Sequence, residues 1–96
     1  HKMREAKLNS EIKTMKIKDS GKTKEEALGK IFTSFRRKVQ TEITGVIVKL
    51  EPLETYLIDI EEEKKTERFL ELFMPREKTI YHIEMEIEYE VKYIKL

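Results

Sequence analysis

The sequence predicts an α+β fold, in which a single amphipathic helix packs on an antiparallel β-sheet. Three observations lead to this prediction: a capped helical stripe over residues 24–41, a final segment that alternates between apolar and polar residues, and a total length of 96 residues, which is typical of one domain. The expected element order is β-α-β-β-β-β or β-α-β-β-β. Residues 1–96 are expected to form this single domain, with residues 1–7 disordered or left over from expression, because His1-Lys2 precedes Met3.

The first strand is expected over Leu8–Lys18, where apolar and polar side chains alternate. The phase of this alternation changes within the segment, which predicts a β-bulge near Thr14-Met15. Asp19-Ser20-Gly21 then has the composition of a turn.

The helix is expected over Lys24–Thr41. Thr23 and Glu26 have the spacing of a capping box, in which the threonine hydroxyl accepts a hydrogen bond from the backbone N–H three residues later. The apolar residues recur three and four positions apart, which predicts one buried stripe. This stripe contains Ala27, Leu28, Ile31, Phe32, Phe35 and Val39. Gly45 is expected to stop the helix.

The middle of the chain predicts further strands. Residues 45–51 and 53–61 are rich in β-branched and aromatic residues, and Pro52 between them has no N–H for the ladder. They form either one long strand bent at Glu51-Pro52 or two strands. A charged hairpin loop, another strand and a turn are expected to follow at Glu61–Thr66, Glu67–Met74 and Pro75–Lys78.

The final strand has the clearest pattern, because every odd position from Tyr81 to Tyr93 is apolar. Such a strand extends about 45 Å at roughly 3.3 Å per residue, whereas a helix of about eighteen residues extends about 27 Å. Part of the apolar face therefore needs another partner, and a second copy is the expected one. The expected interface consists of Tyr81, Ile83, Met85, Ile87, Tyr89, Val91 and Tyr93.

Composition excludes several classes of function. The absence of cysteine excludes disulfides, thiolate metal sites and thiol catalysis, and it fits a cytoplasmic location. No apolar run is long enough to span a membrane. The net charge of +1 combines a basic half, residues 1–44, with an acidic half, residues 45–96. Either the basic half binds nucleic acid or the two halves neutralise each other. The second interpretation is favoured, so no nucleic-acid partner is expected.

The sequence contains few groups that could catalyse a reaction. His82 is the one internal histidine, and with Glu84 it supplies too few ligands for a metal site. A ladder of carboxylates, which could act in acid–base chemistry or bind a hard cation, consists of Glu84, Glu86, Glu88 and Glu90. Lysines of the first strand are expected to neutralise this ladder: Lys13, Lys16 and Lys18. We therefore expect no enzymatic activity, no metal and no cofactor.

Two arginines are candidates for binding an anion. Arg68 and Arg76 flank the expected strand Glu67–Met74, and guanidinium groups bind carboxylates and phosphates through two hydrogen bonds. A small anionic ligand could dock beside them and beside Tyr81 and Tyr89, in a cleft between subunits. The alternative is that both arginines form salt bridges with neighbouring glutamates. The basic residues of the helix are expected to form a solvated face: Lys30, Arg36, Arg37 and Lys38.

Four short motifs carry a resemblance to a known family: Gly21-Lys22-Thr23-Lys24-Glu25-Glu26-Ala27, Leu50-Glu51-Pro52-Leu53, Thr66-Glu67-Arg68-Phe69 and Phe73-Met74-Pro75-Arg76. On these motifs, the chain from Ser10 to Leu96 resembles the small bacterial family catalogued as domain of unknown function 4312. That resemblance implies a cytoplasmic protein of a bacterial gene cluster, some of whose other products are membrane-embedded.

The element order also resembles the dodecin subunit, in which a sheet wraps around one helix and the subunits assemble into oligomers. Dodecins bind flavin between aromatic rings, typically tryptophan, and this chain has no tryptophan, so flavin is not expected here. Together these observations predict a non-enzymatic homo-oligomeric module that self-assembles and docks onto proteins of its own pathway. The alternative is a module that binds a small anionic metabolite in a cleft between subunits.

Overall fold

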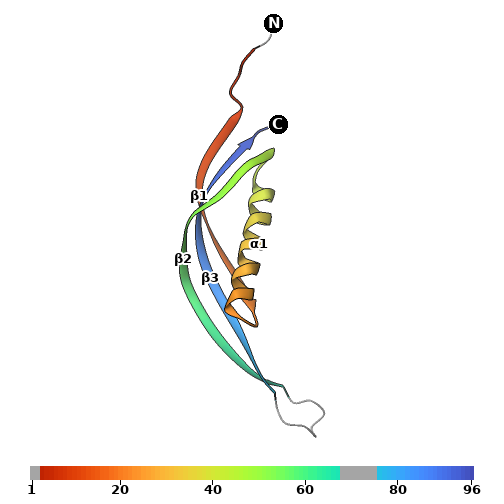
Figure 1. Cartoon of the computed structure of the whole chain (residues 1–96), viewed down its shortest axis with the longest axis vertical. Helices are drawn as coiled ribbons and strands as arrows, with labels where there is room; N and C mark the ends of the chain where they lie inside the picture. Colours follow the sequence, from red (N-terminus) through yellow and green to blue (C-terminus); the bar gives the residue numbers. More distant parts are fainter. Residues whose placement is uncertain (1–2, 68–75) are drawn as a thin grey trace.

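In the computed structural model of the chain, one helix lies along the concave face of a curved sheet (Figure 1). The structure describes residues 3–67 and 76–96. Its elements are β1 (Leu8–Gly21), α1 (Lys24–Glu42), β2 (Val46–Glu67) and β3 (Arg76–Ile94). β3 lies in the centre of the sheet and runs antiparallel to both neighbours. The α+β class is thus confirmed, although the described residues form three strands instead of the expected four or five.

Helix α1 begins as the sequence predicts. Thr23 Oγ1 accepts a hydrogen bond from the backbone N–H of Glu26 at 3.0 Å, and Glu26 in turn lies 3.4 Å from the Lys30 ammonium. At the other end, the N–H of Ile43 donates to the carbonyl of Val39 at 3.2 Å. Gly45 lies two residues beyond this cap, and with a φ of 138° it forms the connection to β2.

The core lies between α1, β1 and β3. One face of the helix is buried through Ala27, Ile31, Phe35 and Val39, and Ile17 of β1 is buried beside it. The buried residues of β3 are Ile83, Met85, Ile87, Tyr89 and Val91. They span about 26 Å of strand, which matches the roughly 28 Å length of this 19-residue helix. Tyr81 and Tyr93, just outside this stretch, are half-buried.

This burial changes the expected interface. Five of its seven residues are covered by α1 within one chain, with exposed fractions of 8% or less, so a second copy cannot reach them while the helix is in place. The extra length of β3 leaves little apolar surface for a partner, because the sheet curves around the helix (Figure 1) and because residues 76–80 contain one large apolar group. Of the eleven large apolar side chains that are exposed among the described residues, seven lie on β2.

The irregularities of the sheet lie on β2 and not on β1. β1 pairs with β3 in unbroken register, from Leu8 opposite Ile94 to Gly21 opposite Tyr81. The predicted bulge near Thr14-Met15 is therefore wrong, and the predicted turn at Asp19-Ser20-Gly21 is the end of the strand. β2 shifts register three times, between Ile47 and Lys49, Pro52 and Glu54, and Leu57 and Asp59.

β2 is one strand of 22 residues that runs through Pro52, so the single bent strand is the correct alternative. A register shift directly after the proline accommodates the missing N–H. The predicted hairpin loop at Glu61–Thr66 is wrong, because this segment pairs with β3. Most of the predicted strand Glu67–Met74 lies outside the described residues. The predicted turn at Pro75–Lys78 is wrong for residues 76–78, which belong to β3.

Candidate functional site

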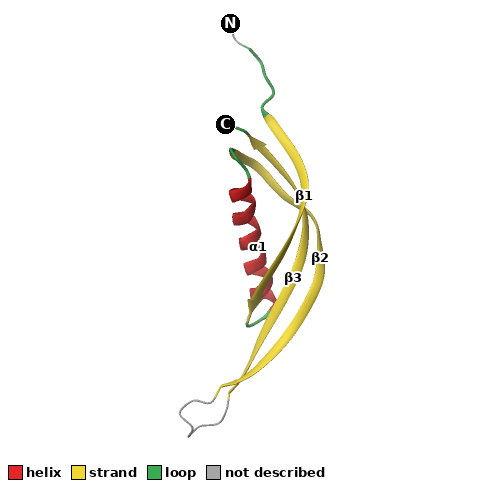
Figure 2. Cartoon of the chain, turned by 180° about the vertical axis from the view of Figure 1, so that it is seen from behind, coloured by secondary structure: helices red, strands yellow, loops and turns green. Residues whose placement is uncertain are grey.

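β2 is the strand that α1 covers least, although Ile47 and Leu50 of β2 are half-buried against the core. The helix packs on β1 and β3, and β2 forms the edge of the sheet next to β3 (Figure 2). Seven large apolar side chains of β2 are exposed, with exposed fractions from 40% to 56%. We refer to these seven as the β2 apolar surface: Val46, Val48, Leu53, Tyr56, Leu57, Ile58 and Ile60.

The width of one helix explains this exposure. An α-helix with its side chains is about 10–12 Å wide, and strands lie about 4.8 Å apart, so one helix covers about two strands. Leu57 lies opposite Met85 and Ile60 opposite Ile83, which places both on the helix side of the sheet, next to core residues. Both stay exposed because the helix is too narrow to cover the third strand. Tyr56 lies opposite Glu86 and belongs to the outer face.

The outer edge of β2 is also unpaired. In the described ranges, residues 3–67 and 76–96, β2 pairs with β3 alone. A long edge strand presents a row of free N–H and C=O groups, which is a template for another strand. The strand is acidic as well, since it contains seven aspartate and glutamate residues and three lysines.

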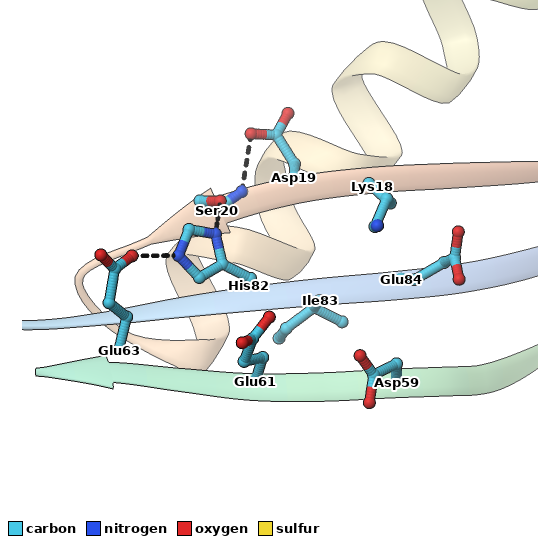
Figure 3. Close-up of a pocket in the computed structure, with 9 residues that line it drawn as sticks. All are labelled: Lys18, Asp19, Ser20, Asp59, Glu61, Glu63, His82, Ile83 and Glu84. Atoms are coloured by element: carbon cyan, nitrogen blue, oxygen red, sulfur yellow. Dashed lines mark hydrogen bonds and ion pairs between the residues drawn. The ribbon is translucent and has the colours of Figure 1, made fainter.

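A second group of polar residues lies on the outer face, near the end of β1 (Figure 3). His82 of β3 bridges the two other strands: its Nδ1 lies 2.6 Å from Ser20 Oγ and its Nε2 lies 2.7 Å from Glu63 Oε2. Because an ionised carboxylate only accepts, Nε2 of His82 donates to Glu63, and in this tautomer Nδ1 accepts a hydrogen bond from the Ser20 hydroxyl. These groups border a cavity of about 630 Å³.

The order serine–histidine–carboxylate matches a nucleophile relay, but two features disfavour acyl transfer. The backbone N–H of Ser20 donates to Asp19 Oδ1 at 2.8 Å, which places a carboxylate where a developing oxyanion would need a donor. The cavity is also lined by further carboxylates, which repel a negative transition state: Asp59, Glu61 and Glu84. The bridge is therefore best explained as a clamp that ties the three strands together.

Sequence reasoning missed this clamp. It paired His82 with Glu84 on the same strand, whereas the partners of His82 are 62 and 19 residues away. Only the registers, which place Ser20 opposite His82 on β1 and Glu61 opposite it on β2, could have indicated it. Among the described residues, no group of three or more histidine, aspartate or glutamate side chains is arranged to hold a metal ion.

The clamp predicts a shifted titration of Glu63. The hydrogen bond from His82 lowers the pKa of this carboxyl below its usual 4.5, and Lys65 adds a smaller electrostatic contribution. A lowered folded-state pKa means that the contact stabilises the strand end above the ordinary carboxyl range and loses its effect as the pH falls through the lowered pKa. We expect His82→Ala to raise the pKa of Glu63 toward 4.5, as measured by NMR of the carboxyl carbon.

Lys65→Ala is the control for this prediction, because it removes the smaller contribution and keeps the hydrogen bond. It should move the titration of Glu63 less than His82→Ala does. Equal shifts in the two variants would show that the histidine contact is not formed in solution.

The carboxylate ladder lies on the outer face, next to two of the three expected lysines. Lys16 is opposite Glu86 and Lys18 is opposite Glu84, so both stand beside the ladder. Lys13 is opposite the buried Tyr89, which places it on the helix side of the sheet, and the expectation that it neutralises the ladder is wrong.

The proposed anion-binding residues do not meet in one place. Arg68 and the side chain of Arg76 lie outside the described residues. Tyr81 is half-buried with the Lys24 ammonium 5.9 Å from its ring centroid, and Tyr89 is packed in the core against Phe35. Eight residues of strand separate the two tyrosines by about 26 Å. One small ligand therefore cannot contact both within a single chain.

A family model described as Domain of unknown function (DUF4312) matches residues 11–94. Neither the search of curated proteins nor the search of solved structures finds a match. Within the part of the chain that the structure describes, no helix combines the length and apolar character needed to cross a membrane.

Proposed function

We propose that this chain, which belongs to the DUF4312 family, is a non-enzymatic module that acts by self-assembly and by docking to proteins of its own pathway. One observation carries the proposal: the long free edge of β2 coincides with the β2 apolar surface. Exposed apolar groups on both faces of a strand with an unpaired edge are typical of a binding surface. Pairing with another chain would satisfy the free N–H and C=O groups of this edge and cover its apolar side chains.

The energetics of a small domain favour this assembly. A chain of this length buries only about 60–65% of its unfolded surface by itself, and each Å² of apolar surface removed from water adds about 25 cal/mol. Covering β2 therefore stabilises the fold as well as the complex. The resemblance to dodecin subunits, in which a sheet wraps around one helix and the subunits assemble, supports the same proposal. We place the module in the bacterial cytoplasm as part of this proposal.

The absence of enzymatic activity is part of this proposal. The strongest catalytic candidate, the clamp of Ser20, His82 and Glu63, has a carboxylate on the N–H that an oxyanion would need. Its hydrogen bonds join three strands and so stabilise the end of the sheet. This structural role accounts for them, and no reaction is needed to explain them.

The test is the mass of the chain in solution at micromolar concentration, measured by native mass spectrometry and light scattering. We expect an oligomer of the 11.6-kDa chain. Leu57→Lys places a charge in the centre of the β2 apolar surface without touching the core, since Leu57 is 56% exposed. This variant should keep its circular dichroism spectrum and shift the population to the single-chain mass.

Leu96→Lys is the matched control, because Leu96 is 88% exposed and lies outside β2. It introduces the same charge and should leave the oligomer intact. A wild-type chain that is strictly monomeric under these conditions contradicts the proposal, and so does equal dissociation in the two variants.

A further inference from the structure

The free edge of β1 is the second unpaired edge of the sheet. In the order β1-β3-β2, the described part of β1 pairs with β3 alone. This edge also carries exposed apolar side chains, since Leu8 is 53% and Ile12 is 64% exposed. Each chain thus has two different free edges, one on either side of the central strand.

A groove lies on the helix near this edge. It has a volume of about 430 Å³ and runs along α1 beside Asp19 of β1. The small residues Gly29, Thr33 and Ser34 are part of its lining, and no heavy atom lies within 4 Å of the position that a Cβ at Gly29 would take. The β1 side of the molecule therefore has room beside its helix for additional side chains.

The charges of the two edges are complementary. β2 contains seven acidic residues and three lysines, whereas β1 contains three lysines and two acidic residues. The groove beside β1 adds Lys30 and Arg37 of α1, together with Glu26, which is ion-paired with Lys30. Pairing β2 with β2 of another copy would bring two acidic strands together, and like charges on adjacent strands are destabilising.

We infer that the free edge of β2 pairs with the free edge of β1 of a second copy of this chain, so that one sheet continues from subunit to subunit. This inference rests on the proposed self-assembly and names the surface that β2 contacts. β1 and β2 both run antiparallel to β3, so they run parallel to each other in a sheet that continues with all helices on one face. The contact is head-to-tail, since it uses different surfaces of the two copies.

The dimensions of the helix and the sheet fit this arrangement. Three strands occupy about 14 Å of sheet width, and a helix with its side chains occupies about 10–12 Å. Successive helices therefore lie side by side with a narrow space between them. Leu57 and Ile60, on the helix side of β2, point into that space, next to the groove on α1 of the neighbouring copy.

The register within one chain identifies which residues meet across the contact. Glu84 is the partner of Lys18 on β1 and of Asp59 on β2, and Figure 3 shows the three side chains across the sheet. Glu86 in the same way has Lys16 and Tyr56 as partners. If the same register continues into the next copy, Asp59 of one copy lies beside Lys18 of the next. These two side chains have opposite charges.

Disulfide cross-linking tests this contact, because the chain has no native cysteine that could compete. Lys18→Cys and Asp59→Cys are combined in one chain, which is oxidised with copper phenanthroline and run on a non-reducing denaturing gel. The two positions within one chain are about 10 Å apart, two strand spacings, and disulfides require Cα atoms about 4.4–6.8 Å apart. Any bond must therefore join two copies.

We expect a ladder of covalent dimers, trimers and larger species that collapses to one band on reduction. Each single-cysteine variant should stay at the mass of one chain. The pair Lys16→Cys and Tyr56→Cys serves as a second position in the same register. All four positions are exposed, so the core is left unchanged.

A covalent dimer from Asp59→Cys alone would show that β2 pairs with β2, and it would overturn the inference. An assembled chain in which neither cysteine pair produces a ladder would overturn it as well, while the proposed self-assembly would stand. A chain that is monomeric in native mass spectrometry would overturn both and leave β2 to a different protein.

Discussion

Phe35→Ala is expected to lower the free energy of unfolding by about 3–5 kcal/mol, the range for emptying a large aromatic site in a core. Phe35 is 1% exposed at the centre of the α1 stripe, and its ring meets that of Tyr89 edge to face at a centroid distance of 5.0 Å. Truncation removes the buried ring and this aromatic contact, which adds about 0.5–1.5 kcal/mol. Domains of this size are stable by about 5–15 kcal/mol, so the variant should unfold at much lower urea concentration.

Phe32→Ala is the matched control, because it makes the same chemical change three positions earlier in the helix, where the side chain is only half-buried. Its effect should be clearly smaller. Both variants need to be compared at one protein concentration, since association raises apparent stability. Equal losses in the two variants would mean that α1 does not rest on the sheet through the face that carries Phe35.

Gly45→Ala is expected to have the second large effect, a loss of at least about 2 kcal/mol. Gly45 has a φ of 138°, a conformation that residues with a side chain rarely adopt. A Cβ at this position would also overlap the backbone carbonyl oxygen of Ile94 at the end of β3. The substitution therefore strains the connection from α1 to β2 and displaces the strand end that it packs against.

Gly29→Ala is the control for this prediction. Gly29 lies inside α1, and a Cβ there would have no heavy atom within 4 Å, so alanine should stabilise the helix by about 1 kcal/mol. Thermal unfolding followed by circular dichroism should move in opposite directions in the two variants. A Gly45→Ala chain as stable as the wild type would contradict the backbone conformation described for this connection.

The sequence by itself determined the elements whose signals are local. Thr23, the acidic first turn and the apolar stripe of α1 specify a helix through contacts between residues three and four apart, and the structure confirms it to within one residue. The alternation from Tyr81 to Tyr93 specifies β3 in the same way. The membership of residues 11–94 in a known family also depends on the sequence alone.

The middle of the chain was harder to predict, because its local signals point to interruptions. Pro52 and the charged run Glu61–Thr66 favour breaks in isolation, yet both lie within β2. β2 tolerates them because it pairs on only one edge: register shifts accommodate the proline, and exposed positions accommodate the charges.

Only the tertiary structure decided which apolar residues stay uncovered and which polar residues meet. Periodicity shows which side of an element is apolar, but it does not show which neighbour covers that side. The curvature of the sheet brought the apolar face of β3 under α1 (Figure 1), and the width of the single helix left most large apolar groups of β2 exposed. Strand register, a property of paired segments far apart in the chain, brought Ser20 and Glu63 to His82. Both outcomes depend on how whole elements pack together, and that information is not contained in any single segment.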